Sequence, residues 1–167
     1  MSTRISSLVL ALALVLCLTG CSLFSGDKSG GKKVSVFNIQ PGQCFETPGT
    51  VKAQLSSLTK VPCTSPHSEE AYAVIQYQSA ANASVSTTGV AVGGAYPGDD
   101  VLTPFAQGAC AQRFTDYVGV DYLDSKLYFT YLLPSARSWE QDADRYVTCF
   151  VTTTGNKLTS SVKGSKQ

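Results

Sequence analysis

The sequence predicts an α+β domain in which a small antiparallel sheet carries one main helix packed on it and is cross-linked by two disulfides. Three observations lead to this prediction. One long segment, residues 99–118, repeats apolar side chains every three or four residues, which is the period of a helix. Several shorter segments have the alternation and the β-branched or aromatic content typical of strands. Four cysteines lie among these segments.

The expected strands are short and separated by turn-forming residues. They lie at residues 34–39, 43–45, 58–63, 70–78, 127–133 and 145–152. The Pro41-Gly42 turn indicates that the first two form a hairpin-like unit. Residues 127–133 are apolar on both faces, which predicts a central place in the sheet. In the last strand Cys149 falls on the same side as the valines next but one to it, so that face is expected to meet the helix.

The helix has signals at both ends. Asp99 or Asp100 suits its N-terminus, and Gly119 predicts its end. Pro104 is compatible with the helix only in its first turn, where a missing N–H breaks no hydrogen bond.

The N-terminal residues 1–20 have the layout of a secretory signal peptide, with one cation, Arg4, before an apolar run at residues 8–18. This run is shorter than the about 20 residues that a permanent membrane helix needs. The run ends in Leu18-Thr19-Gly20-Cys21, which resembles the lipobox of bacterial lipoproteins. The resemblance implies that Cys21 receives a diacylglycerol and becomes the first residue of the mature chain.

Residues 22–33 are rich in Ser, Gly and Lys, and the segment from Cys21 to residue 33 is expected to be a lipidated, flexible tether spanning roughly 20 Å. The expected location is therefore the outer face of the cytoplasmic membrane, with that membrane as a partner through the lipid anchor.

Residues 34–154 are long enough for one domain, and the polar tail at residues 155–167 is expected to fray. Without Arg4 the Lys and Arg count falls from 13 to 12, equal to the Asp and Glu count, so no nucleic-acid partner is expected.

The chain has six cysteines, of which Cys17 leaves with the signal peptide and Cys21 carries lipid. The other four, in an exported domain, predict two disulfides and allow three pairings. The favoured pairing joins neighbouring predicted elements: Cys44 with Cys63, and Cys110 with Cys149. The alternative is a zinc site at Cys63 and His67, but the chain has no C-x-x-C motif, so neither a metal nor a cofactor is expected.

A set of short motifs spread over the predicted domain resembles one known family. They are Pro41-Gly42-Gln43-Cys44-Phe45, Val61-Pro62-Cys63-Thr64-Ser65-Pro66-His67-Ser68-Glu69-Glu70, Tyr96-Pro97-Gly98 before a helix with Cys110, then Pro134, Trp139, and Asp144-Arg145 before Cys149. Together they resemble the septum formation domain of envelope proteins and lipoproteins of high-GC Gram-positive bacteria. The resemblance implies a role in septum formation during cell division.

Four polar or aromatic residues are candidates for contact with a partner or ligand: His67, Glu70, Trp139 and Arg145. His67 and Glu70 are more simply expected to bond each other or a neighbouring strand and fix a turn. Trp139 equally fits a core position at the end of the sheet, and Asp144 with Arg145 is expected to form a local ion pair.

Three functions are weighed. The first is a non-catalytic binding or adaptor lipoprotein with an envelope or division protein as its partner. The second is a small-molecule or cell-wall-fragment binder with its site at Trp139. The third, an envelope hydrolase, would require His67, the only histidine. Because the chain has no G-x-S-x-G motif and both cysteines near His67 are expected to be oxidised, no catalytic residue is assigned.

Overall fold

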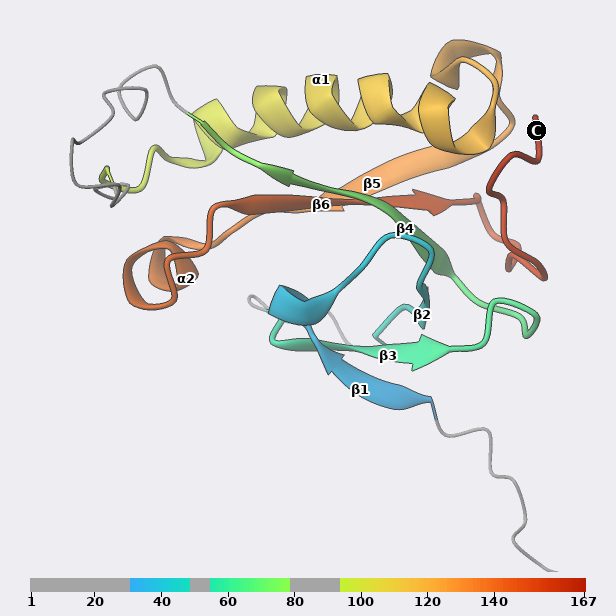
Figure 1. Ribbon diagram of the computed structural model, residues 1–167, viewed down its shortest axis with the longest axis horizontal. Helices are drawn as coiled ribbons and strands as arrows, with labels where there is room; N and C mark the ends of the chain where they lie inside the picture. Colours follow the sequence, from blue (N-terminus) through green and yellow to red (C-terminus); the bar gives the residue numbers. More distant parts are fainter. Residues whose placement is uncertain (1–30, 49–54, 79–93) are drawn as a thin grey trace, which may run out of the picture. The chain divides into compact units, whose positions relative to one another are not determined.

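The computed structural model describes residues 31–48, 55–78 and 94–167. Within them lies a six-stranded antiparallel sheet with the strand order β1-β3-β2-β4-β6-β5 (Figure 1). The strands are β1 (Lys32–Ser35), β2 (Cys44–Glu46), β3 (Ser57–Val61), β4 (Glu69–Gln76), β5 (Tyr128–Leu132) and β6 (Tyr146–Thr152). The helices are α1 (Asp99–Val118), α2 (Ala136–Gln141) and the 3-10 turns η1 (Val36–Asn38) and η3 (Tyr122–Asp124). The predicted α+β class is confirmed.

α1 packs along one face of the sheet, against β4, β5 and β6 (Figure 1). Its buried side chains recur every fourth residue and form a single stripe: Leu102, Ala106, Cys110, Phe114 and Val118. The helix ends at Gly119, whose φ of 88° is the left-handed conformation that glycine adopts without strain. The predicted bounds and stop are confirmed.

The position of Pro104 within α1 differs from the prediction. Gly98 is the N-cap residue, so Asp99 and Asp100 both lie in the first turn, where their charge is favourable at the helix N-terminus. Pro104 consequently lies in the second turn, and the expectation that it fits only in the first turn is wrong. The carbonyl left without its N–H partner is that of Asp100, which is an exposed residue, so burial adds no cost.

Two predicted features of the sheet are wrong. β1 and β2 do not pair with each other, because both flank β3. β5 pairs only with β6 and is therefore an edge strand, although it was expected at the centre. It is apolar on both sides because Phe129 and Tyr131 contact the core under α1 while Leu132 packs on the opposite face.

Both predicted disulfides are present. Cys44 of β2 is bonded to Cys63, and Cys110 of α1 is bonded to Cys149 of β6, so the second bridge joins the helix to the sheet. A bulge between Ala71 and Ala73 puts Tyr72 on the helix side, where its hydroxyl donates to the Cys110 carbonyl at 2.8 Å.

Residues 155–167 belong to the folded domain, and the expectation that they fray is wrong. Leu158 and Val162 are buried in the core beneath α1. The backbone N–H groups of Gly164 and Lys166 donate to the carbonyls of Tyr117 and Val118, which the last helical turn leaves without partners. The segment therefore completes both the core and the C-terminal end of α1.

Candidate functional site

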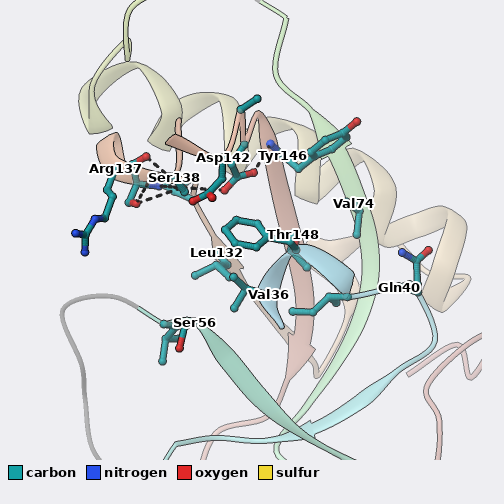
Figure 2. Close-up of a pocket in the computed structure, with 17 residues that line it drawn as sticks. Val36, Gln40, Ser56, Val74, Leu132, Arg137, Ser138, Asp142, Tyr146 and Thr148 are labelled. Atoms are coloured by element: carbon teal, nitrogen blue, oxygen red, sulfur yellow. Dashed lines mark hydrogen bonds between the residues drawn. The ribbon is translucent and has the colours of Figure 1, made fainter. Parts of the chain in front are cut away.

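The face of the sheet opposite α1 is hollowed into a groove of about 1000 Å³ (Figure 2). We call it the sheet-face groove. Its main apolar lining residues are Val36, Phe37, Ile39, Leu55, Val74 and Leu132. Its polar lining comes chiefly from Gln40, Ser135, Arg137, Ser138, Asp142 and Asp144. An apolar lining with a few polar groups is the usual composition of a binding site.

Local sequence explains each wall of the groove. On one side η1 interrupts the strand expected at residues 34–39, because the Ser35 side chain accepts a hydrogen bond from the Phe37 N–H and caps the turn. Phe37 is thereby left 53% exposed at the groove. β6 contributes Tyr146 and Thr148, the side chains that alternate with the helix-facing Val147 and Cys149.

On the other side α2 is fixed by a capping box between Ser135 and Ser138. Ser138 also donates to the Asp144 carboxylate at 3.0 Å, and that carboxylate accepts the Tyr146 N–H at 3.1 Å. These bonds hold the Asp144 carboxylate in place at the rim of the groove (Figure 2). Arg137 is exposed at the same rim.

Trp139 does not line the groove. It is only 2% exposed, and its indole N–H donates to the Gly94 carbonyl at 2.7 Å. Its ring contacts Tyr77 and Tyr96. Trp139 is therefore a core residue, which confirms the core position that the sequence offered beside the contact role.

Arg145 supports Trp139 and forms no ion pair with Asp144. Its guanidinium lies 3.8 Å from the centroid of the indole ring, a cation–π contact, and donates to the carbonyls of Trp139 and Asp144. The predicted Asp144–Arg145 ion pair is wrong because the Arg145 guanidinium is directed to the indole ring and to two backbone carbonyls, while the Asp144 carboxylate accepts from Ser138 and the Tyr146 N–H.

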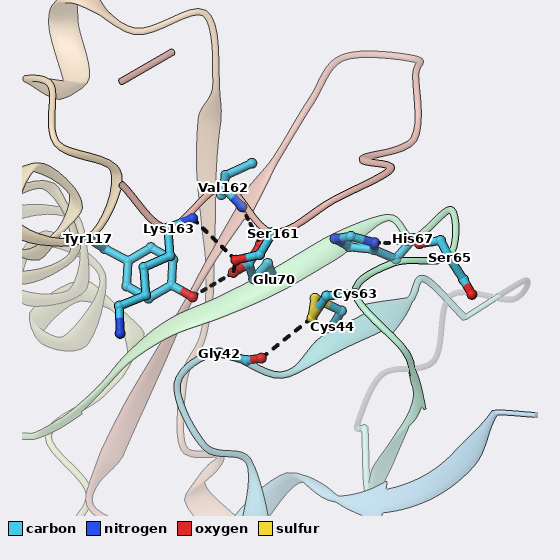
Figure 3. The surroundings of a disulfide bond; sticks show 10 residues. All are labelled: Gly42, Cys44, Cys63, Ser65, His67, Glu70, Tyr117, Ser161, Val162 and Lys163. Atoms are coloured by element: carbon cyan, nitrogen blue, oxygen red, sulfur yellow. Dashed lines mark hydrogen bonds between the residues drawn. A yellow bond between two sulfur atoms is a disulfide. The ribbon is translucent and has the colours of Figure 1, made fainter. Parts of the chain in front are cut away.

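Glu70 lies fully buried on β4 and accepts hydrogen bonds from residues 155–167, which we call the C-terminal segment (Figure 3). Its carboxylate accepts from the Tyr117 hydroxyl at 2.5 Å, the Ser161 hydroxyl at 2.6 Å and the Val162 N–H at 2.8 Å. Burial first, then the hydrogen bond and charge of Glu70, raise the pKa of the Tyr117 phenol. Glu70 is structural, as predicted, but the expected partners are wrong: its partners lie on α1 and in the C-terminal segment and not on His67 or a neighbouring strand, so Glu70 ties distant segments and not a local turn.

His67 is also fully buried, beside the Cys44–Cys63 disulfide (Figure 3). Its backbone forms an isolated antiparallel bridge with Leu158, and its Nδ1 lies 2.8 Å from the Ser65 carbonyl. It therefore fixes the turn before β4, as predicted, but through Ser65 and Leu158.

The structure brings His67 and Glu70 together and separates both from the groove lining, and Trp139 and Arg145 form another cluster. Sequence reasoning missed the sheet-face groove. The alternation of Tyr146, Thr148 and Phe150 away from the helix side was the available signal, but it does not show whether other segments cover that face.

Cys21 lies outside the described residues. Among the residues that are described, no helix has both the length and the apolar character needed to cross a bilayer.

Comparison with known proteins identifies a family for the chain. No curated protein and no solved structure matches the chain. A family model described as "Septum formation" matches residues 41–166, a range that includes both disulfides, α1 and all but the last residue of the C-terminal segment. The chain therefore belongs to the septum formation family.

Proposed function

We propose that this chain is an extracytoplasmic lipoprotein, anchored to the cytoplasmic membrane through Cys21, whose domain binds an envelope or division protein and acts as an adaptor in septum formation. Membership of the septum formation family supports the process. The observation that supports a binding role is the sheet-face groove, because a hollow with an apolar lining and a few polar groups is typical of a binding site.

The groove has the character of a protein-binding surface. Phe37 and Tyr146 are both about half exposed, and large exposed aromatic side chains are typical anchors at interfaces. The charged residues Arg137, Asp142 and Asp144 lie around them and supply the polar rim that such interfaces have.

A non-catalytic role is supported by the surroundings of His67. A hydrolase would need this imidazole next to a nucleophile and a substrate, but it is buried away from the groove. Its Nδ1 is held by Ser65, and the neighbouring Cys44 is oxidised in a disulfide and cannot act as a thiolate.

The experiment is site-specific photocrosslinking in living cells combined with localisation. A photoreactive residue at Phe37 is expected to give a discrete adduct with one envelope or division protein. The same residue at Leu123, which is 85% exposed on η3 and does not line the groove, is expected to give none.

Substitution tests the same point. Phe37→Ser is expected to abolish enrichment at division sites, while Leu123→Ser is expected to preserve it. The adaptor proposal is wrong if both variants are enriched at division sites, if cells carrying either variant divide as cells with the parent do, and if neither position 37 nor position 123 gives an adduct.

The polar rim favours one second candidate, a cell-wall fragment or small polar molecule as the groove's ligand. The sequence placed this site at Trp139, but Trp139 is buried, and Trp139→Ala would lower the free energy of unfolding by about 3–5 kcal/mol. The residue to test is therefore Arg137, which lines the groove. A muropeptide is expected to raise the melting temperature of the parent and of Arg113→Ala, an exposed arginine on α1, but not that of Arg137→Ala. No shift in the parent would remove this candidate.

A further inference from the structure

The Cys44–Cys63 disulfide lies in a small polar cluster that the adaptor role does not use (Figure 3). The Cys44 sulfur, a ring nitrogen of His67 and a carboxylate oxygen of Glu70 all lie within 4.8 Å of one another. All three side chains are fully buried. They come from β2, the turn before β4, and β4 itself.

The orientation of the His67 ring leaves one nitrogen unused. A carbonyl oxygen can only accept, so Nδ1, 2.8 Å from the Ser65 carbonyl, carries the proton. In the neutral ring Nε2 then presents a lone pair, and it is buried without a hydrogen-bond partner. An Nδ1–H bonded to a backbone carbonyl with a free Nε2 is the usual arrangement of a histidine that binds a metal.

Glu70 has acceptor capacity left in the same place. A carboxylate has about four lone-pair positions, and three of them are filled: two on Oε1, by Tyr117 and Ser161, and one on Oε2, by the Val162 N–H. One position on Oε2 remains. These three bonds also fix the carboxylate, which is what a preorganised ligand needs.

Cys63 is bonded to Cys44 and is partly exposed, while Cys44 is buried. The Cys63 sulfur lies 3.5 Å from the Gly42 carbonyl. In the oxidised state neither sulfur is a thiolate, so the cluster lacks the two soft ligands that zinc favours.

We propose that reduction of the Cys44–Cys63 disulfide by an external dithiol creates a tetrahedral zinc site formed by both cysteines, His67 Nε2 and Glu70. The set of two thiolates, one imidazole and one carboxylate consists of ligand types that zinc uses in proteins. Bound zinc would hold β2 and the turn before β4 together in place of the disulfide.

The steps balance. A thiolate of the dithiol attacks the more exposed Cys63 sulfur, and Cys44 leaves as a thiolate and takes up a proton. The second thiol of the reagent then attacks the mixed disulfide, releases Cys63 and closes its own disulfide, so two electrons pass to the protein. Zinc binding displaces the protons of both cysteines to solvent.

The test uses the full-length chain, purified oxidised or reduced with a phosphine, which adds no competing thiol. Co²⁺ alone, as a probe, is expected to bind the reduced chain at one equivalent with a sulfur-to-cobalt charge-transfer band that Zn²⁺ abolishes. The oxidised chain is expected to give no such band. Cys44→Ser/Cys63→Ser, which keeps the other four cysteines, is the matched control and is expected to give none either.

His67→Gln is expected to bind cobalt about tenfold or more weakly than the reduced parent, since even supporting partners of a metal ligand are worth this much. No cobalt uptake by the reduced parent, equal uptake by the double serine variant, or parental affinity in His67→Gln would each overturn the proposal.

Alkylation followed by mass spectrometry gives a second measurement that needs no variant. Zinc is expected to slow alkylation of Cys44 and Cys63 in the reduced parent and to leave Cys110 and Cys149 unchanged. Equal slowing at all four cysteines, or at none, would also overturn it.

Discussion

At the scale of single residues, Glu70 has the largest expected effect on stability among the polar side chains described, because one buried carboxylate accepts three hydrogen bonds. Glu70→Gln replaces a charged acceptor with a neutral amide and leaves some of these donors unpaired in the core. We expect it to lower the free energy of unfolding by about 3 kcal/mol, measured by urea denaturation.

The matched control is Glu46→Gln, which removes the exposed ion pair with Lys157. Exposed pairs contribute less than about 1 kcal/mol, so this variant is expected to unfold close to the parent. Equal losses in the two variants would show that the Glu70 contacts do not stabilise the fold.

Tyr117 makes stability depend on alkaline pH. Its pKa is raised in the folded chain, first by burial and then by Glu70, above the unfolded value of about 10. The stabilisation is therefore complete below about pH 10 and is lost as the pH rises from there through the folded pKa. Tyr117→Phe is expected to be less stable than the parent at pH 8 and to lose less stability between pH 9 and 11 in urea titrations. An unchanged pH slope would contradict this.

At the scale of elements, sequence reasoning predicted what local periodicity encodes. The apolar stripe from Leu102 to Val118 and the glycine after it define α1, and the side of β6 that carries Cys149 follows from alternation. Alternation shows which face a strand buries and not which strand lies next to it. The positions of β1 and β5 in the sheet therefore could not be predicted.

The C-terminal segment was missed for a related reason. Only Leu158 and Val162 are buried in a mostly polar stretch, and their neighbours bond to Glu70 and to the end of α1, far away in the sequence. The candidate site was predictable only in part, because His67 and Glu70 do adjoin each other, while the sheet-face groove depends on how η1 and α2 border the sheet.

The two disulfides are expected to contribute unequally because they close loops of different length. Cys110–Cys149 spans 39 residues and Cys44–Cys63 spans 19. On the chain-entropy model these loops correspond to about 4 and about 3 kcal/mol. Cys110→Ala/Cys149→Ala is therefore expected to lower the urea midpoint more than Cys44→Ala/Cys63→Ala does. The reverse order would indicate that native contacts around the buried Cys44 outweigh loop entropy.

At the scale of the whole molecule, the two faces of the sheet are covered differently. One face is covered by α1 and the C-terminal segment, and the other carries a smaller apolar cluster beside the sheet-face groove. The disulfides, Glu70 and the Trp139–Arg145 contact fix the framework, so exposed groove residues such as Phe37 can be changed with little effect on folding.

The proposed anchor gives the prediction with the widest consequence. Two acyl chains on Cys21 would hold the chain at the membrane, since each buried methylene contributes about 0.8 kcal/mol and two chains together give stable attachment where one does not. Cys21→Ser is expected to move the protein from the membrane fraction to the soluble extracytoplasmic fraction and to remove it from division sites. Its domain should keep the parent's melting temperature, because the described fold begins beyond this residue. Lys32 and Lys33 belong to β1, so the tether expected at residues 22–33 is at least two residues shorter and spans less than roughly 20 Å. The proposed partner should therefore itself lie close to the bilayer. Retention of Cys21→Ser in the membrane fraction would show that something other than lipid on this thiol holds the chain there.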